Sequence, residues 1–222
     1  MSDEDRRHEG VETIIEDVQA AGRTWRLCRL ANRAQFHDPD GEAAAMGVHE
    51  NVWPLFGILW PSAASLCNAL SRVPLHDDRV LELGCGLALV SMSLHARGIE
   101  VLASDVHPRA GEFLAHNAEL NGLSTVPFER IDWTQDYPSL APFSVIVASD
   151  VLYEDDMVPD IVRFIERHSA PHCRVFMVDP GRAGRRNRFT EAMREHGFRY
   201  EAWQPDPEEK LRVMRFERGT EA

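Results

Sequence analysis

The 222-residue sequence predicts an α/β fold in which a doubly wound, mostly parallel sheet carries helices on both faces. Two observations predict it. From Arg79 onward, short apolar runs alternate with segments of helical periodicity, which is typical of parallel strands joined by crossover helices. The last two apolar segments, Phe198–Trp203 and Leu211–Glu217, have no helical pattern between them. They predict an antiparallel hairpin, with a turn through Pro205–Pro207, and complete a seven-stranded sheet.

Each element of this sheet follows from a short stretch of sequence. The five predicted parallel strands are Val80–Leu83, Glu100–Ser104, Val126–Ile131, Phe143–Ser149 and Cys173–Val178. The helices predicted around them are Leu87–Arg97, Arg109–Asn121, Met157–His168 and Arg188–His196. A further helix is predicted over Ser62–Leu70, because Pro61 suits the first turn of a helix.

The region before this domain predicts a smaller β unit. We expect residues 1–52 to form an N-terminal extension and residues 53–222 the main domain. Met1–Gly10 is charged and predicts a disordered start, whereas Val11–Phe36 has short apolar alternations that predict a β hairpin packed on the core. Phe36–Glu50 shows little periodicity and a turn signal, so it predicts a mobile loop. Residues 36–53 are also a candidate lid over an active site.

Composition limits the classes of function. With 44% hydrophobic residues the chain is long enough for one α/β domain, and its net charge of −12 disfavours a nucleic-acid partner. The sequence has no secretory h-region and no stretch near the roughly 18 apolar residues that a membrane span needs. Four well-separated cysteines predict reduced thiols, and His107, His116 and His172 share no ligand spacing. We therefore expect a cytoplasmic protein without a metal site.

A glycine-rich turn is the sharpest local signal. Leu81–Ala88 predicts a buried strand that runs into a turn and then a helix, and Gly86 permits a ligand to approach the backbone at the helix N-terminus. Leu89 occupies the place of the third glycine of a dinucleotide fingerprint. The turn therefore disfavours a pyrophosphate, although Gly84 and Gly86 could also serve only to make a tight turn.

Acidic strand ends complete the prediction of a nucleoside site. Asp105 ends the next strand, 19 positions after Gly86, where a carboxylate can accept both hydroxyls of a ribose. Asp132 and Trp133 follow the third strand at the same carboxyl edge, and they suit an adenine ring. Helix capping by Asp105 and core packing by Trp133 are the structural alternatives.

These residues resemble the donor motifs of class I, seven-stranded, Rossmann-like methyltransferases. The segments Leu59–Ala63 and Ser149–Glu154 more narrowly resemble methyltransferase family 16, the lysine methyltransferases with an Asp/Glu-x-x-Tyr signature, a group that includes nicotinamide N-methyltransferase-like bacterial proteins. The segment Asp179–Arg182 looks like members acting on an electron transfer flavoprotein subunit. The resemblance implies S-adenosylmethionine as donor and S-adenosylhomocysteine as product. The cofactor-binding residues predicted with it are Trp60, Glu82, Gly84, Cys85, Gly86, Asp105, Asp132, Trp133 and Ala148.

The same resemblance implies that Asp150 and Tyr153 are the catalytic residues. A lysine ammonium has no lone pair at neutral pH and must lose a proton before it attacks a methyl group. Asp150 would orient the amine, and Tyr153 would supply a hydroxyl and an aromatic face. The structural alternative is that Asp150 caps the next helix and Tyr153 is a half-buried packing residue.

Three functions follow from this sequence. The leading one is N-methylation of a lysine ε-amine on a protein, and the second is methylation of a small amine or a nicotinamide-type compound. The third is a regulatory protein that binds the donor without turnover. The arginine cluster Arg182–Arg188 is either a grip for an acidic substrate surface or a solvated face. The acceptor, the degree of methylation and the oligomeric state stay open.

Overall fold

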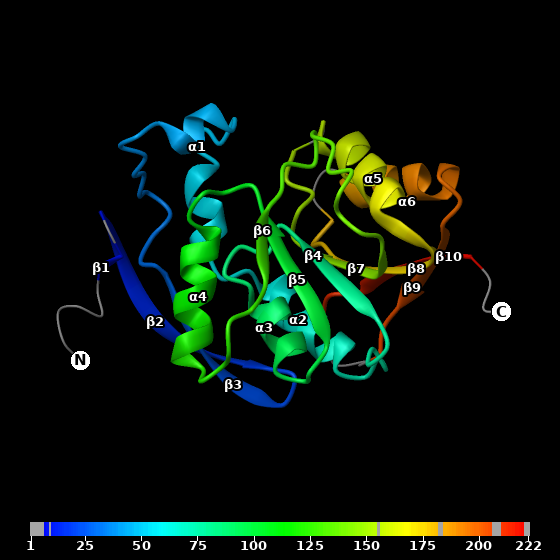
Figure 1. Cartoon of the computed structure of the whole chain (residues 1–222), viewed down its shortest axis with the longest axis horizontal. Helices are drawn as coiled ribbons and strands as arrows, with labels where there is room; N and C mark the ends of the chain where they lie inside the picture. Colours follow the sequence, from blue (N-terminus) through cyan, green and yellow to red (C-terminus); the bar gives the residue numbers. More distant parts are fainter. Residues whose placement is uncertain (1–6, 9, 155, 182–183, 206–209, 220–222) are drawn as a thin grey trace.

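A computed structural model describes residues 7–8, 10–154, 156–181, 184–205 and 210–219. In this part of the chain a seven-stranded sheet has the order β6-β5-β4-β7-β8-β10-β9 (Figure 1). Strands β4 to β8 run parallel, and β10 runs antiparallel to both β8 and β9. The strand order reverses between β4 and β7, as in a doubly wound sheet. The predicted fold class is confirmed.

The elements follow the predicted order closely. The strands of the large sheet are β4 (Arg79–Leu83), β5 (Glu100–Asp105), β6 (Phe128–Arg130), β7 (Phe143–Ser149), β8 (Ser169–Val178), β9 (Arg199–Trp203) and β10 (Val213–Arg218). The helices around it are α2 (Pro61–Leu70), α3 (Leu89–His95), α4 (Ala110–Leu120), α5 (Met157–His168) and α6 (Arg185–Glu195). Most boundaries lie within two residues of the prediction. β8 and α6 begin earlier than predicted, and α6 follows a left-handed Gly184.

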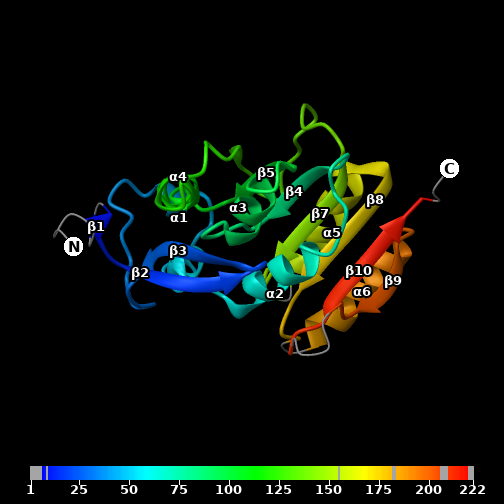
Figure 2. The ribbon, with the colours of Figure 1, turned by 90° about the horizontal axis from the view of Figure 1, so that it is seen from below.

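The helices divide between the two faces of the sheet (Figures 1 and 2). Buried residues of α2, α3 and α4 share one apolar core with one side of the sheet, which includes Val80 and Val145. Buried residues of α5 and α6 share the second core with the other side, which includes Leu81 and Ile146. Adjacent strand residues thus serve opposite cores, as the two-residue period of a strand requires.

The N-terminal extension forms a separate small sheet. Strands β1 (Arg7–His8), β2 (Val11–Ala20) and β3 (Arg23–Leu30) pair antiparallel, and the predicted hairpin is present as β2 and β3. The hairpin lies beside α2 and α4 (Figure 2). Trp25 and Leu27 are fully buried in the core beneath α2, and the side chain of Asn117 on α4 bonds both backbone groups of Cys28. The extension is therefore packed on the domain.

Residues 36–53, which include the predicted mobile loop 36–50 and form the candidate lid, contain regular secondary structure. They contain the short helix α1 (Glu42–Ala45), and a 3-10 helix, η2 (Trp53–Gly57), follows directly. The Asp38 carboxylate accepts hydrogen bonds from the backbone N–H groups of Ala43 and Ala44, at 3.0 Å each, and these bonds hold its pKa below the ordinary value. Trp53 is completely buried. Capping and burial therefore give this segment a defined path.

Some predicted features lie outside the described residues. These are most of the start of the chain, Asp206 and Pro207 of the predicted turn, and Arg182 of the arginine cluster. The four cysteines are free and buried. No helix in the described ranges combines the length and the apolar character needed to cross a membrane. Nor does any group of three or more His, Cys, Asp or Glu side chains within those ranges have an arrangement that could hold a metal ion.

Candidate active site

A cavity of about 480 Å³ lies at the carboxyl edge of the sheet, where β4, β5 and β7 end. Its size falls within the roughly 300–1,000 Å³ of small-molecule sites, and its position is the switch point of the strand order. The cavity brings together eight of the eleven predicted site residues: Trp60, Gly84, Cys85, Gly86, Asp105, Trp133, Asp150 and Tyr153.

The glycine-rich turn forms the floor of this cavity. Gly84 and Gly86 have φ angles of 61° and 52°, a backbone region that favours glycine. A Cβ atom added to Gly84 would lie 2.9 Å from Val151, and one added to Gly86 would lie 2.8 Å from the backbone oxygen of Phe56. Both glycines are therefore required by their conformation and by close contacts.

Asp105 ends β5 and is held by the backbone of two neighbouring turns. Its Oδ2 accepts a hydrogen bond from Gly86 N at 2.8 Å, and its Oδ1 accepts one from His107 N at 2.9 Å. Burial raises the pKa of this carboxyl, and the two backbone bonds oppose that shift. Each carboxylate oxygen keeps a further lone pair for a ligand hydroxyl. Residue Arg109 precedes α4, so Asp105 is not the cap of that helix.

Two ring nitrogens beside Asp105 are buried without a hydrogen-bond partner in the described part of the chain. They are Nε1 of Trp133 and Nε2 of His107, and both residues line the cavity. The His107 ring stacks on Phe56 with a centroid separation of 3.7 Å, and burial lowers its pKa to about 3. A buried polar atom without a partner is costly, so these nitrogens indicate a polar ligand in the cavity.

The segment that leads into α2 supplies the apolar wall. Val48, Val52, Leu55 and Phe56 line the cavity from this side. The indole N–H of Trp60 donates to the backbone oxygen of Leu55 at 3.1 Å, which fixes the plane of the Trp60 ring. This wall is largely apolar, as expected for a site that binds an organic ligand.

Asp150 follows β7 in a strained conformation. Its φ angle is 58°, which is uncommon for a residue other than glycine, and its N–H donates to Val178 O at 2.9 Å. The Oγ of Ser62, a buried residue of α2, donates to Asp150 Oδ2 at 3.2 Å. Asp156 precedes α5, so the alternative role of Asp150 as the cap of that helix does not hold. Strain at a cavity edge is typical of functional residues.

Tyr153 completes the cavity beside Asp150. Burial is the main cause that raises the pKa of its phenol, and the charges of Asp105 and Glu154 act in the same direction. The hydroxyl therefore stays protonated at neutral pH and can donate a hydrogen bond.

A family profile described as lysine methyltransferase matches residues 48–196. The chain belongs to this family. It is 31% identical over 134 residues to the electron transfer flavoprotein beta subunit lysine methyltransferase of Xenopus laevis, covering 59% of this chain and 54% of the relative. It is 33% identical over 117 residues to the histone-arginine methyltransferase METTL23 of Xenopus laevis, covering 48% of this chain and 50% of the relative. The chain thus spans about half the length of these curated relatives.

A solved structure supports the fold of this lysine methyltransferase family member. The Thermus thermophilus 16S rRNA N2 methyltransferase RsmC, in complex with AdoMet and guanosine, aligns with a TM-score of 0.63 at 16% sequence identity. The alignment covers 93% of this chain and 50% of that chain. At this identity the similarity shows the methyltransferase fold and not the acceptor.

Three residues predicted to bind the donor of this family member do not line the cavity. Glu82 is buried beneath α3, where its carboxyl accepts hydrogen bonds from Ser91 N and Ser91 Oγ, and burial raises its pKa to about 8. Ala148 is buried in β7 and belongs to the core that β7 shares with α5 and α6. The next residue, Ser149, lines the cavity. Their predicted role in donor binding stays a prediction.

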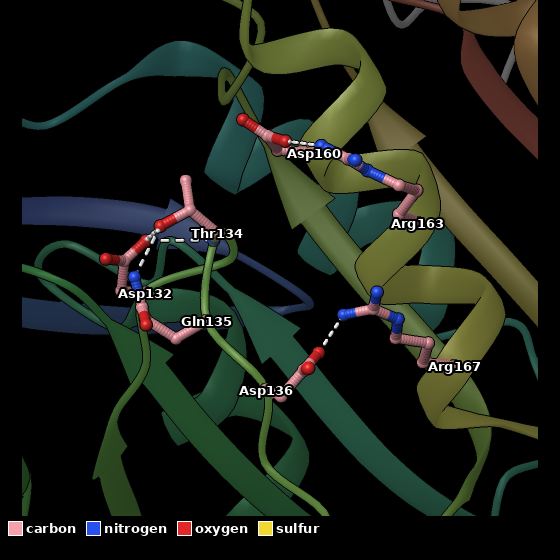
Figure 3. A network of polar contacts seen from close by, with 7 residues as sticks. All are labelled: Asp132, Thr134, Gln135, Asp136, Asp160, Arg163 and Arg167. Atoms are coloured by element: carbon pink, nitrogen blue, oxygen red, sulfur yellow. Dashed lines mark hydrogen bonds and ion pairs between the residues drawn. The ribbon is translucent and has the colours of Figure 1, made fainter.

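Asp132 is the third of these residues. Its Oδ1 accepts hydrogen bonds from the backbone N–H and the hydroxyl of Thr134, as Figure 3 shows. The same turn is tied to α5 by an ion pair between Asp136 and Arg167. The carboxylate of Asp132 therefore stabilises the turn after β6, which holds Trp133 against the glycine-rich turn.

The structure also adds residues that the sequence did not single out for this site. His107, Ser149, Arg33 and the apolar wall formed by residues 48–59 line the cavity, and Ser62 contacts Asp150. His107 lies two positions after the predicted ribose acid, and Ser62 and Ser149 lie within the two segments that carry the family resemblance, although none of the three was predicted as a site residue. Arg33 is distant in sequence from the glycine-rich turn, so no local pattern pointed to it.

Proposed function

We propose that this protein is an S-adenosylmethionine-dependent methyltransferase that modifies a lysine ε-amine of a protein substrate. One observation carries the proposal: the glycine-rich turn with Asp105 and the pair Asp150 and Tyr153 line a single cavity. A donor site and an acceptor site must share one space for a methyl group to pass between them directly.

The cavity residues fit the donor's nucleoside. The Asp105 carboxylate lies beside the glycine-rich turn and can accept the ribose hydroxyls. The unpartnered ring nitrogens of Trp133 and His107 match the polar edge of a nucleoside. These groups would bind the nucleoside end of S-adenosylmethionine.

The acceptor residues fit an amine. S-adenosylmethionine supplies an electrophilic methyl group on a sulfonium, and this chain supplies alignment and charge. The Asp150 carboxylate orients the incoming amine and stabilises its cationic form after transfer, because opposite charges attract strongly in a partly buried site. Tyr153, kept neutral by its raised pKa, donates a hydrogen bond and presents its ring to the cation. The amine loses its proton to solvent before attack, so Asp150 need not be a strong base.

The family supports a protein acceptor. Several curated relatives have names that specify lysine methylation of proteins, among them the flavoprotein methyltransferases at 27–31% identity. Another relative is a histone-arginine methyltransferase, so arginine is the competing acceptor. Four free, buried cysteines are in keeping with a reducing compartment such as the cytoplasm.

The test uses the full chain, radiolabelled S-adenosylmethionine and a lysate from cells that lack this protein. We expect label in a protein band, at a lysine identified by mass spectrometry, and no label with the Asp150→Asn variant. Label at arginine, or only in the small-molecule fraction, would replace lysine as the acceptor. Absence of label in every fraction, with intact donor binding by calorimetry, would support a regulatory protein that binds the donor without turnover.

A further inference from the structure

Arg33 lies in the turn after β3, outside the segment that matches the family. Its guanidinium Cζ lies 4.7 Å above the centre of the Trp60 ring, and the residue lines the same cavity as Gly84 and Gly86. The N-terminal extension therefore reaches the site that the main domain forms at the carboxyl edge of its sheet.

The turn that carries Arg33 is anchored to β2. The Gln35 side chain accepts a hydrogen bond from Glu12 N at 2.6 Å and donates one to Glu12 O at 2.9 Å. The Asn32 carboxamide oxygen accepts a bond from Ala34 N at 2.9 Å, which closes the turn. This geometry, together with the stacking on Trp60, holds the guanidinium at the cavity although the residue is exposed.

The charges around Arg33 indicate its partner. Among the described residues that line the cavity, it is the one side chain that is positively charged at neutral pH, because burial keeps His107 neutral. Arg33 has no ion-pair partner in the described ranges. The other charged lining residues, Asp105 and Asp150, are negative. A guanidinium repels both a sulfonium and an amine that becomes a cation, so in this cavity Arg33 suits the anionic part of the donor.

We propose that Arg33 binds the carboxylate of the donor's amino-acid part, so that the N-terminal extension completes the donor site. The inference rests on the proposed function. A guanidinium offers two parallel N–H groups that match a carboxylate, and Trp60 limits the orientations available to it. Asp105 then holds the nucleoside end and Arg33 holds the amino-acid end, with the sulfonium between them near Asp150.

The experiment compares two ligands on the full chain by calorimetry. S-adenosylmethionine has the carboxylate, whereas decarboxylated S-adenosylmethionine keeps the ammonium, the sulfonium and the nucleoside and lacks only that group. Arg33→Met keeps an unbranched apolar side chain against Trp60 and removes the charge. Arg26→Met is the matched control, since Arg26 is an exposed arginine of β3 in the same N-terminal extension and does not line the cavity.

We expect Arg33→Met to weaken S-adenosylmethionine binding about ten-fold and to change binding of the decarboxylated ligand by less than about two-fold. Arg26→Met should change neither affinity. An equal loss for both ligands, or no loss for either, would overturn the assignment of Arg33 while leaving the proposed function in place. A wild-type protein that binds neither ligand would overturn both.

Discussion

Two acids at neighbouring strand ends, Asp105 and Asp150, face the same cavity but are held in different ways. Asp105 is 8% exposed, and each of its oxygens accepts a hydrogen bond from a backbone amide. Asp150 has a left-handed backbone, and its Oδ2 accepts a hydrogen bond from the hydroxyl of Ser62.

The difference fits the role that is proposed for each acid. A carboxylate held by two backbone amides has a fixed position, which suits a binding group that meets the same ribose in every cycle. A carboxylate held by a side-chain hydroxyl can exchange that partner for an incoming amine. The hydrogen bond from the N–H of Asp150 to Val178 O, on the neighbouring strand, helps to hold the strained backbone of Asp150.

The largest expected effect is on the rate after changes at Asp150. We expect Asp150→Ala to lower the single-turnover methylation rate by at least about a hundred-fold, and to change donor affinity by only a few-fold. Asp150→Asn is the matched variant, since asparagine tolerates a positive φ and keeps an acceptor for Ser62. It should lose rate similarly while keeping stability. Near-normal rates in both folded variants would remove Asp150 from the acceptor site.

At Asp105 we expect the main effect to be on donor affinity. Asp105→Ala should weaken donor binding by about 1.5–3 kcal/mol, because it removes charge-assisted hydrogen bonds to the ribose. It also leaves the N–H groups of Gly86 and His107 without their acceptor, so the free energy of unfolding should fall too. Calorimetry with S-adenosylhomocysteine and urea unfolding separate the two effects. Unchanged donor affinity in a folded variant would mean that Asp105 only stabilises the turns.

A third acid, Glu82, is expected to make the free energy of unfolding depend on pH. Its pKa in the folded protein is about 8, against an ordinary value of 4.5, because it is buried beneath α3. The unfolded chain therefore releases this proton first as pH rises. The contribution of Glu82 to the free energy of unfolding is fully present below pH 4.5 and is lost as pH approaches 8. Between these values the free energy of unfolding falls by at most about 1.4 kcal/mol per pH unit. Glu82→Gln should remove this slope in urea unfolding measured across the range. If the free energy of unfolding varied with pH in the same way for the wild type and for Glu82→Gln, the raised pKa of Glu82 would be contradicted.

The smallest expected effect is at Ser62. Ser62→Ala should lower the methylation rate by about three- to ten-fold, since one hydrogen bond to Asp150 is lost. The same change in the Asp150→Asn background should have less effect, because the carboxylate that it orients is absent. A double-mutant cycle of single-turnover rates measures this coupling. Additive effects would show that Ser62 acts through packing alone.

The sheet could be predicted in detail from local patterns. β7 and α5 have the predicted bounds, because an apolar run and a helical period each depend on residues close together in the sequence. The defined path of residues 36–53 could not be predicted in this way. Its helix depends on the cap from Asp38, and its course depends on burial of Trp53 against the domain.

Part of the candidate site could likewise be predicted from local patterns, and part could not. Gly84, Gly86, Asp105 and Asp150 could be predicted to share one cavity because each lies at or shortly after the end of a parallel strand, and these carboxyl ends meet at one edge. Ser149 lines the cavity, whereas the sequence prediction named Ala148, the residue before it. Which of two adjacent side chains enters a cavity depends on how the end of the strand bends.

The sequence by itself determined the fold class, the order of the strands along the chain and the acids at their ends, because these follow from period, length and glycine placement. Tertiary structure alone decided that Arg33 lines the same cavity as Asp105 and Asp150, and that Ser62 donates a hydrogen bond to Asp150. Arg33 follows the β2–β3 hairpin and Ser62 lies on α2, and both precede the large sheet in sequence. Their contacts are made by packing between distant segments, and no local period encodes such contacts.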